Sequence, residues 1–111
     1  MPGYGRPKRA LCYPLRAVWG TNPRDVDSPT KFLIIIPKRK LRHAVDRVKM
    51  RRRVREAYRL NRGLLAGAPA GLNIAFIYVA DTLKPYAAVE RSVRRLLASA
   101  AKNKSLSHSI F

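Results

Sequence analysis

The chain has 111 residues, and its 24 Lys and Arg against six Asp and Glu give a formal net charge of +18. Its hydrophobic content of 47% is not that of a disordered chain, and its length suits one domain. So large an excess of positive charge destabilises a compact fold unless a polyanion relieves it, which makes nucleic acid the first candidate partner and an anionic membrane surface the second.

The first twelve residues are rich in Pro, Gly and basic side chains, and we expect them to be disordered. They lack the continuous apolar segment of a signal peptide, and no apolar run in the chain approaches the roughly 18 residues that a transmembrane helix needs. Cys12 is the single cysteine, which excludes an intrachain disulfide and indicates a reducing compartment. We therefore expect a cytoplasmic protein with no membrane partner.

Two strands are predicted next. In YPLRAVW, residues 13–19, alternate side chains share a face, which places Arg16 and Val18 opposite Trp19. After a turn-rich connection, KFLIIIP at residues 31–37 is a continuous apolar and β-branched run. Such a run predicts a central strand that is covered on both faces.

A basic loop, KRKLRH, leads into a long helix that is predicted to run from Ala44 to Leu65. On a helical wheel most of its surface is arginine, among which Glu56 can pair with Arg52 or Arg59. The apolar side chains fall within a sector of roughly 120° that we expect to face the core. They are Met50, Val54, Ala57, Tyr58, Leu64 and Leu65.

The segment AGAPAG, residues 66–71, ends this helix, because Gly and Pro disfavour helical structure. LNIAFIYVA, residues 72–80, then predicts another buried strand. Since a long helix separates this strand from the one at 31–37, the three elements predict a β-α-β crossover.

A second helix is predicted at residues 81–102, with Asp81 or Thr82 as its cap and Pro85 in its first turn. Residues 103–111 lack periodicity and are expected to be disordered. The order strand, strand, helix, strand, helix predicts an α+β fold, a two-layer α/β sandwich with a small mixed sheet. The second helix has one apolar stripe, formed by Val89, Val93, Leu96, Leu97 and Ala100.

Half of the positive charge lies between residues 38 and 62, where twelve basic residues accompany two acidic ones. A solvated face normally mixes both signs, and a membrane-surface helix needs its apolar face for lipid, whereas here the sheet needs that face. Arginine binds phosphate with two parallel hydrogen bonds, so we expect nucleic-acid binding. The residues expected to take part are Lys38, Arg39, Lys40, Arg42, Arg47, Lys49, Arg51, Arg52, Arg53, Arg55, Arg59 and Arg62.

The segment AVDRVKMRRRVREAYR, residues 44–59, resembles the signature of the protein component of bacterial ribonuclease P. In that signature a small-apolar pair, Arg-Asn, Lys/Arg-Arg and Arg-Glu follow one another on one helix. The likeness extends to YPLRAVW, FLIIIPKRK and DTLKPYAAVERSVRRLL, and covers roughly residues 10–102. Val48 stands where the family has Asn, and its side chain can neither donate nor accept a hydrogen bond. On the helical wheel Val48 lies about 140° from the core-facing stripe, among the arginines. The matching residues are Ala44, Val45, Arg47, Arg51, Arg52, Arg55 and Glu56.

The resemblance implies a protein subunit that performs no chemistry itself. In this family the RNA subunit hydrolyses precursor tRNA at the mature 5′ end with Mg²⁺, and the protein binds both that RNA and the single-stranded 5′ leader. We therefore expect the partners to be the ribonuclease P RNA and precursor tRNA, with no cofactor or metal bound by the protein. Expected leader contacts are Arg16, Val18 and Tyr78, with Lys38 and Arg39 nearby.

The family also has an amphipathic helix before the first strand, whereas only about twelve residues precede Tyr13 here. Three explanations remain open: a start that is assigned late, a truncated sequence, or a neighbouring chain that fills the place of the helix. An apolar sheet face that this helix does not cover favours association. We therefore expect self-association through that face.

Two other functions remain open, namely a small basic RNA-binding protein of the ribosomal or RNA-chaperone type, and an autonomous metal-dependent nuclease. A two-metal nuclease needs several convergent carboxylates. Asp46 and Glu56 are ten residues apart, which is about 15 Å along a helix, so they cannot share a metal. His43 is expected to face solvent or phosphate. We therefore expect no catalytic residue in this chain.

Overall fold

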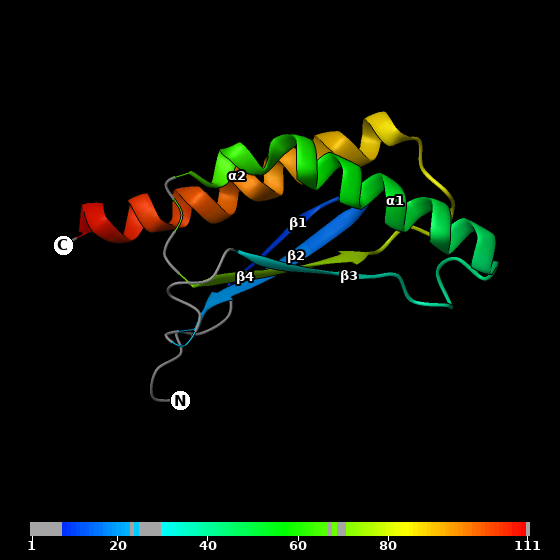
Figure 1. Cartoon of the computed structure of the whole chain (residues 1–111), viewed down its shortest axis with the longest axis horizontal. Coiled ribbons are helices and arrows are strands. Elements are labelled where there is room, and N and C mark those ends of the chain that lie inside the picture. Colours follow the sequence, from blue (N-terminus) through cyan, green and yellow to red (C-terminus); the bar gives the residue numbers. More distant parts are fainter. Residues whose placement is uncertain (1–7, 23, 25–29, 67, 69–70, 111) are drawn as a thin grey trace.

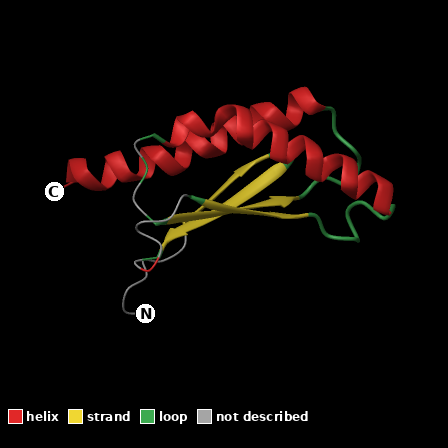
Figure 2. Ribbon diagram, viewed as in Figure 1, coloured by secondary structure: helices red, strands yellow, loops and turns green. Residues whose placement is uncertain are grey.

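The computed structural model describes residues 8–22, 24, 30–66, 68 and 71–110, with residues 102–110 described by their backbone alone. Two helices cover one face of a four-stranded sheet, as Figures 1 and 2 show, so the predicted two-layer α+β fold is confirmed. The elements are β1 (Lys8–Cys12), β2 (Leu15–Thr21), β3 (Lys31–Ile35), α1 (Ala44–Asn61), the 3₁₀ helix η2 (Arg62–Leu65), β4 (Leu72–Tyr78) and α2 (Tyr86–Ile110).

The sheet is mixed and its strand order is β1-β2-β4-β3. β2 pairs antiparallel with both β1 and β4, whereas β3 pairs parallel with β4. Because α1 connects these two parallel strands, the predicted β-α-β crossover is present. The arrangement leaves β1 and β3 at the two edges of the sheet.

The position of β3 differs from the prediction of a central strand covered on both faces. Phe32 and Ile34 lie on the helix side and pack against the core, whereas Leu33 is 59% and Ile35 is 39% exposed. A continuous apolar run does not distinguish these two environments, so the prediction was wrong about both the place of the strand and its outer face.

The core lies between the sheet and the two helices. Every residue of the predicted stripe on α2 is buried, and so are four of the predicted residues on α1: Met50, Val54, Ala57 and Tyr58. The Tyr58 ring stacks on Phe32, with 4.1 Å between ring centroids. Leu64 is 42% exposed instead of buried, because the chain has tightened into η2, where the turn per residue is larger than in an α-helix.

The first strand and the start of α2 differ from the prediction. Residues 8–12 were expected to be disordered, but they form β1 and pair with β2; residues 1–7 lie outside the described part. α2 begins at Tyr86, and the carbonyl of Pro85 accepts hydrogen bonds from the amides of Ala88 and Val89, so the expected cap at residue 81 or 82 was wrong.

The carboxyl end of α2 also departs from the prediction, because the helix extends to Ile110, beyond residue 102 where it was expected to end. No Gly or Pro interrupts residues 103–110, which are therefore compatible with helix. Within the described residues, neither helix combines the length and the apolar composition needed to cross a bilayer.

Candidate nucleic-acid interface

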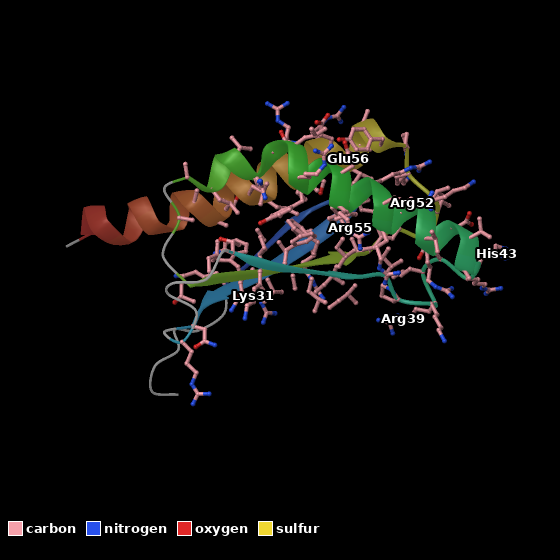
Figure 3. The ribbon with its side chains drawn as sticks, viewed as in Figure 1. Lys31, Arg39, His43, Arg52, Arg55 and Glu56 are labelled. Carbon is pink, nitrogen blue, oxygen red and sulfur yellow. The ribbon has the colours of Figure 1, made fainter. Side chains whose placement is uncertain are left out.

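α1 carries most of the candidate interface, because its buried stripe fixes which way every other side chain points. With Met50, Val54 and Ala57 against the sheet, the remaining side chains of α1 face either solvent or α2. Figure 3 shows Arg39 and His43 at the end where the loop enters α1, and Arg52 and Arg55 further along the helix. The exposed members of the predicted set are Lys38, Arg39, Arg42, Lys49, Arg52, Arg55, Arg59 and Arg62.

Two of the predicted arginines bind the protein's own backbone. The Arg47 guanidinium donates from Nη1 to the carbonyls of Leu41 and Arg42, at 2.8 and 2.9 Å. The Arg53 guanidinium donates to the carbonyl of Lys84. Arg47 thereby fixes the basic loop to the first turn of α1, and Arg53 fixes the segment that precedes α2.

Two ion pairs neutralise part of the surface. The Arg59 guanidinium contacts the Glu56 carboxylate at 2.7 Å, which is one of the two pairings that the sequence predicted for Glu56. The hydrogen bond from Arg59 lowers the pKa of the Glu56 carboxyl. Lys40 lies 3.2 Å from Asp81 and joins the two loops. Half-buried Arg51 and the remaining exposed residues of the set have no ion-pair partner in the described part of the chain; the exposed ones are Lys38, Arg39, Arg42, Lys49, Arg52, Arg55 and Arg62.

A hollow of about 500 Å³ opens where the basic loop meets α1. His43 stands at the amino end of α1 there, with extended backbone geometry and no capping hydrogen bond from its side chain. The positive end of a helix dipole favours phosphate, whereas the carboxylates of Asp46 and Asp81, which also line the hollow, oppose it. The hollow is lined by Arg39, Lys40, Leu41, Arg42, His43, Asp46, Asp81, Thr82 and Leu83.

An apolar pair interrupts the arginine surface. Val48 is 48% exposed and Val45, one turn earlier on the same side of α1, is 64% exposed. The sequence predicted that Val48 lies among the arginines, and its exposure agrees with that placement. The position offers no hydrogen-bonding side chain to a ligand.

The second part of the interface is the sheet face away from the helices, which we call the open sheet face. The strand register places Val18 beside Ala75, and Ala75 beside Leu33, so the centre of this face is apolar. No described element covers it. Its residues are Arg9 and Leu11 on β1; Arg16, Val18 and Gly20 on β2; Asn73, Ala75 and Ile77 on β4; and Lys31, Leu33 and Ile35 on β3.

Of the three predicted leader contacts, Arg16 and Val18 lie together on the open sheet face, but Tyr78 does not. Tyr78 is paired with Leu15 on the helix-covered face and is 1% exposed. Burial raises the pKa of its phenol, and the hydroxyl donates to the carbonyl of Thr82. The prediction for Tyr78 was wrong, because the helices cover the face of β4 on which Tyr78 lies.

Sequence reasoning did not identify most of the open sheet face. The alternation of β3 places Leu33 and Ile35 on one face, yet only the pairing with β4 shows that this face is open. Trp19, which the sequence places on the opposite face of its strand from Arg16 and Val18, is 5% exposed and belongs to the core. Among the described residues, no three His, Cys, Asp or Glu side chains are grouped so that they could hold a metal ion.

Comparison with known proteins gives a consistent result. A family model described as Ribonuclease P matches residues 6–101. The ribonuclease P protein components of two Porphyromonas gingivalis strains are each 35% identical over 104 residues, which covers 90% of this chain and 76% of each relative.

Solved structures share the fold. The RNase P protein from Thermotoga maritima, in complex with 1-(4-fluorophenyl)-2-thiourea, superposes with a TM-score of 0.66 at 21% identity, covering 84% of this chain and 85% of that one. The Staphylococcus aureus RNase P protein gives a TM-score of 0.63 at 18% identity, covering 86% of this chain and 82% of that one.

Proposed function

The chain belongs to the ribonuclease P protein family, and from this membership we propose that it is the protein subunit of a bacterial ribonuclease P. In this role it binds the catalytic RNA and the 5′ leader of precursor tRNA, and so assists the 5′ maturation of tRNA. The observation that carries the proposal is the arginine surface of α1 and its loop, where seven exposed basic residues have no ion-pair partner in the described part.

The α1 surface supplies contacts to the folded RNA. Guanidinium groups such as those of Arg52 and Arg55 can bind phosphate through two hydrogen bonds each. Phosphate contacts release counterions and dominate the affinity of proteins for nucleic acids. The hollow beside His43 adds the positive end of a helix dipole to the same surface.

The open sheet face is suited to a single strand. Its apolar centre at Val18, Ala75 and Leu33 can pack against bases, while Arg9 and Arg16 provide charge for the backbone of the strand. Binding sites for single-stranded nucleic acid usually combine basic residues that follow the phosphates with aromatic side chains that stack on the bases; on this face aliphatic side chains take the place of the aromatic ones. We assign the leader to this face.

We assign the chemistry to the RNA and its Mg²⁺. The residues of this chain contribute by neutralising phosphates and by holding the leader in place. Arg47 and Arg53 contribute indirectly, because they fix the loops that carry other basic residues.

Reconstitution tests this proposal. The protein is added to a catalytic RNA of its own type, in low salt and low Mg²⁺, and cleavage of precursor tRNA is followed. We expect the protein to stimulate cleavage at the mature 5′ end and to cleave nothing on its own. RNA binding without stimulation would favour a ribosomal or chaperone-type protein instead. Magnesium-dependent cleavage by the protein alone would contradict the proposal.

A further inference from the structure

The outer face of α2 carries three arginines that the α1 interface does not include. Arg91, Arg94 and Arg95 are exposed, and we call them the α2 arginine cluster. None of them has an ion-pair partner among the described residues. Glu90 is the only acidic residue of α2, and its carboxylate accepts a hydrogen bond from the Asn61 amide at 3.3 Å.

The cluster lines a hollow of about 530 Å³ between η2 and α2. Leu64, the residue of the predicted core stripe that is exposed, forms an apolar part of its wall. Ala87 and Ala98 are also in the lining, and their small side chains leave room above the helix. Glu90 lines the hollow as well, so three guanidinium groups and one carboxylate lie beside the apolar wall and leave it with an excess of positive charge.

The cluster is separate from the α1 arginine surface. α1 and α2 pack side by side (Figure 1), and Arg53 and Asn61 lie on the flank of α1 that faces α2. Arg55 is about 200° from Arg53 around α1, on the side of Tyr58, which stacks on β3. A ligand that contacts both Arg55 and the cluster must therefore extend over the outer surface of both helices.

We propose that the α2 arginine cluster is a second RNA-binding surface, which contacts the backbone of the same folded RNA that binds α1. The proposal rests on the proposed function, since the ligand is the ribonuclease P RNA. Residues three and four apart on a helix share one face, so Arg91 directs its guanidinium to the same side as Arg94 and Arg95. Three forked donors without carboxylate partners match phosphates.

The charge of the whole chain favours RNA over an acidic peptide. With a net charge of +18, the protein needs a partner that carries many negative charges to relieve its self-repulsion. A folded RNA supplies these charges over both helices at once. The apolar part of the hollow is only Leu64 and two alanines, which is little surface for a protein partner.

The test uses the full chain and its catalytic RNA. The double variant Arg91→Gln/Arg94→Gln removes two charges while Gln preserves helix propensity. We expect roughly tenfold weaker binding in low salt, and a slope of log affinity against log salt that falls by up to about two units. Circular dichroism should show an unchanged fold.

The matched control is Lys8→Gln/Arg24→Gln, which removes the same charge from two exposed positions outside all three surfaces. Its salt slope should stay at the wild-type value. If the cluster variant keeps the RNA affinity and the salt slope of this control, the inference is overturned. Binding of an acidic protein to the α2 arginine cluster would not rescue it. Failure of the proposed function is distinguishable, because in that case the wild-type chain itself does not stimulate cleavage.

Discussion

At the scale of single residues, the arginines of α1 have two different roles that their sequence context does not distinguish. Arg47 uses its guanidinium on the carbonyls of Leu41 and Arg42, whereas Arg52 is exposed and has no ion-pair partner in the described part. The same side chain therefore supports the fold at one position and is available to a ligand at the other.

The two arginines should separate stability from RNA binding. We expect Arg47→Ala to lower the free energy of unfolding by about 1–3 kcal/mol, because two carbonyls lose their charged donor. Arg52→Ala should leave that free energy within about 0.5 kcal/mol and lower the salt slope of RNA binding by up to about one unit. Urea denaturation and a salt titration measure the two effects. Equal stability of the two variants would contradict the role assigned to Arg47.

Val48 gives a second prediction. Because it is 48% exposed, Val48→Asn should leave the free energy of unfolding nearly unchanged, since the two residues have similar helix propensity. It adds a donor and an acceptor among the arginines, and we expect RNA affinity to rise by roughly two- to tenfold, the equivalent of one hydrogen bond. Fluorescence anisotropy with the labelled catalytic RNA measures this change in affinity.

The control for this change is Val45→Asn, one turn away and more exposed at 64%. The same gain at both positions would indicate a general effect of a polar side chain instead of a contact at residue 48.

These residues show where sequence reasoning reaches its limit. The exposure of Val48 followed from its angle on the wheel, which depends only on local geometry. The inward role of Arg47 depends on where the loop carbonyls lie, and the burial of Tyr78 on which face of β4 the helices cover. Both are set by tertiary packing, which spacing along the chain does not encode.

At the scale of elements, helix α1 was the most predictable part of the molecule. Its apolar residues recur with the helical period, so its core-facing stripe could be read from spacing. The edge position of β3 could not, because a continuous apolar run is compatible with burial on one face or on both. The end of α1 was partly predictable, since the chain stays helical to Leu65 but changes to a 3₁₀ turn.

The burial of Val54 allows a test of α1 as a packing element. Val54 is fully buried, so Val54→Ala should lower the free energy of unfolding by roughly 1–3 kcal/mol through lost apolar burial. The salt slope of RNA binding should not change, because no charge is removed. Val45→Ala, on the exposed side of the same helix, is the control and should have little effect on stability. An equal loss in both would contradict the role assigned to burial, because Val→Ala raises helix propensity at either position.

At the scale of the whole molecule, charge and apolar surface act against each other. The open sheet face exposes Leu11, Leu33 and Ile35, which favours association of copies. Each copy carries +18, however, and Arg9 and Arg16 flank the apolar centre. The radius of gyration is 14.4 Å, while the Debye length is about 30 Å at 0.01 M salt and about 10 Å at 0.1 M. Repulsion therefore acts across the entire molecule only in low salt.

This balance predicts that self-association through the open sheet face increases with salt, whereas RNA binding decreases with salt. Light scattering across a concentration series should give a monomer mass in about 0.01 M salt and a rising mass above about 0.1 M, where the charges are screened. Leu33→Gln should reduce the rise, because it removes an apolar side chain from the centre of the face. Leu60→Gln, at an exposed leucine on α1, is the matched control and should not. A single-stranded RNA that occupies the open sheet face should also prevent association. A monomer mass at high protein concentration and high salt would contradict the prediction.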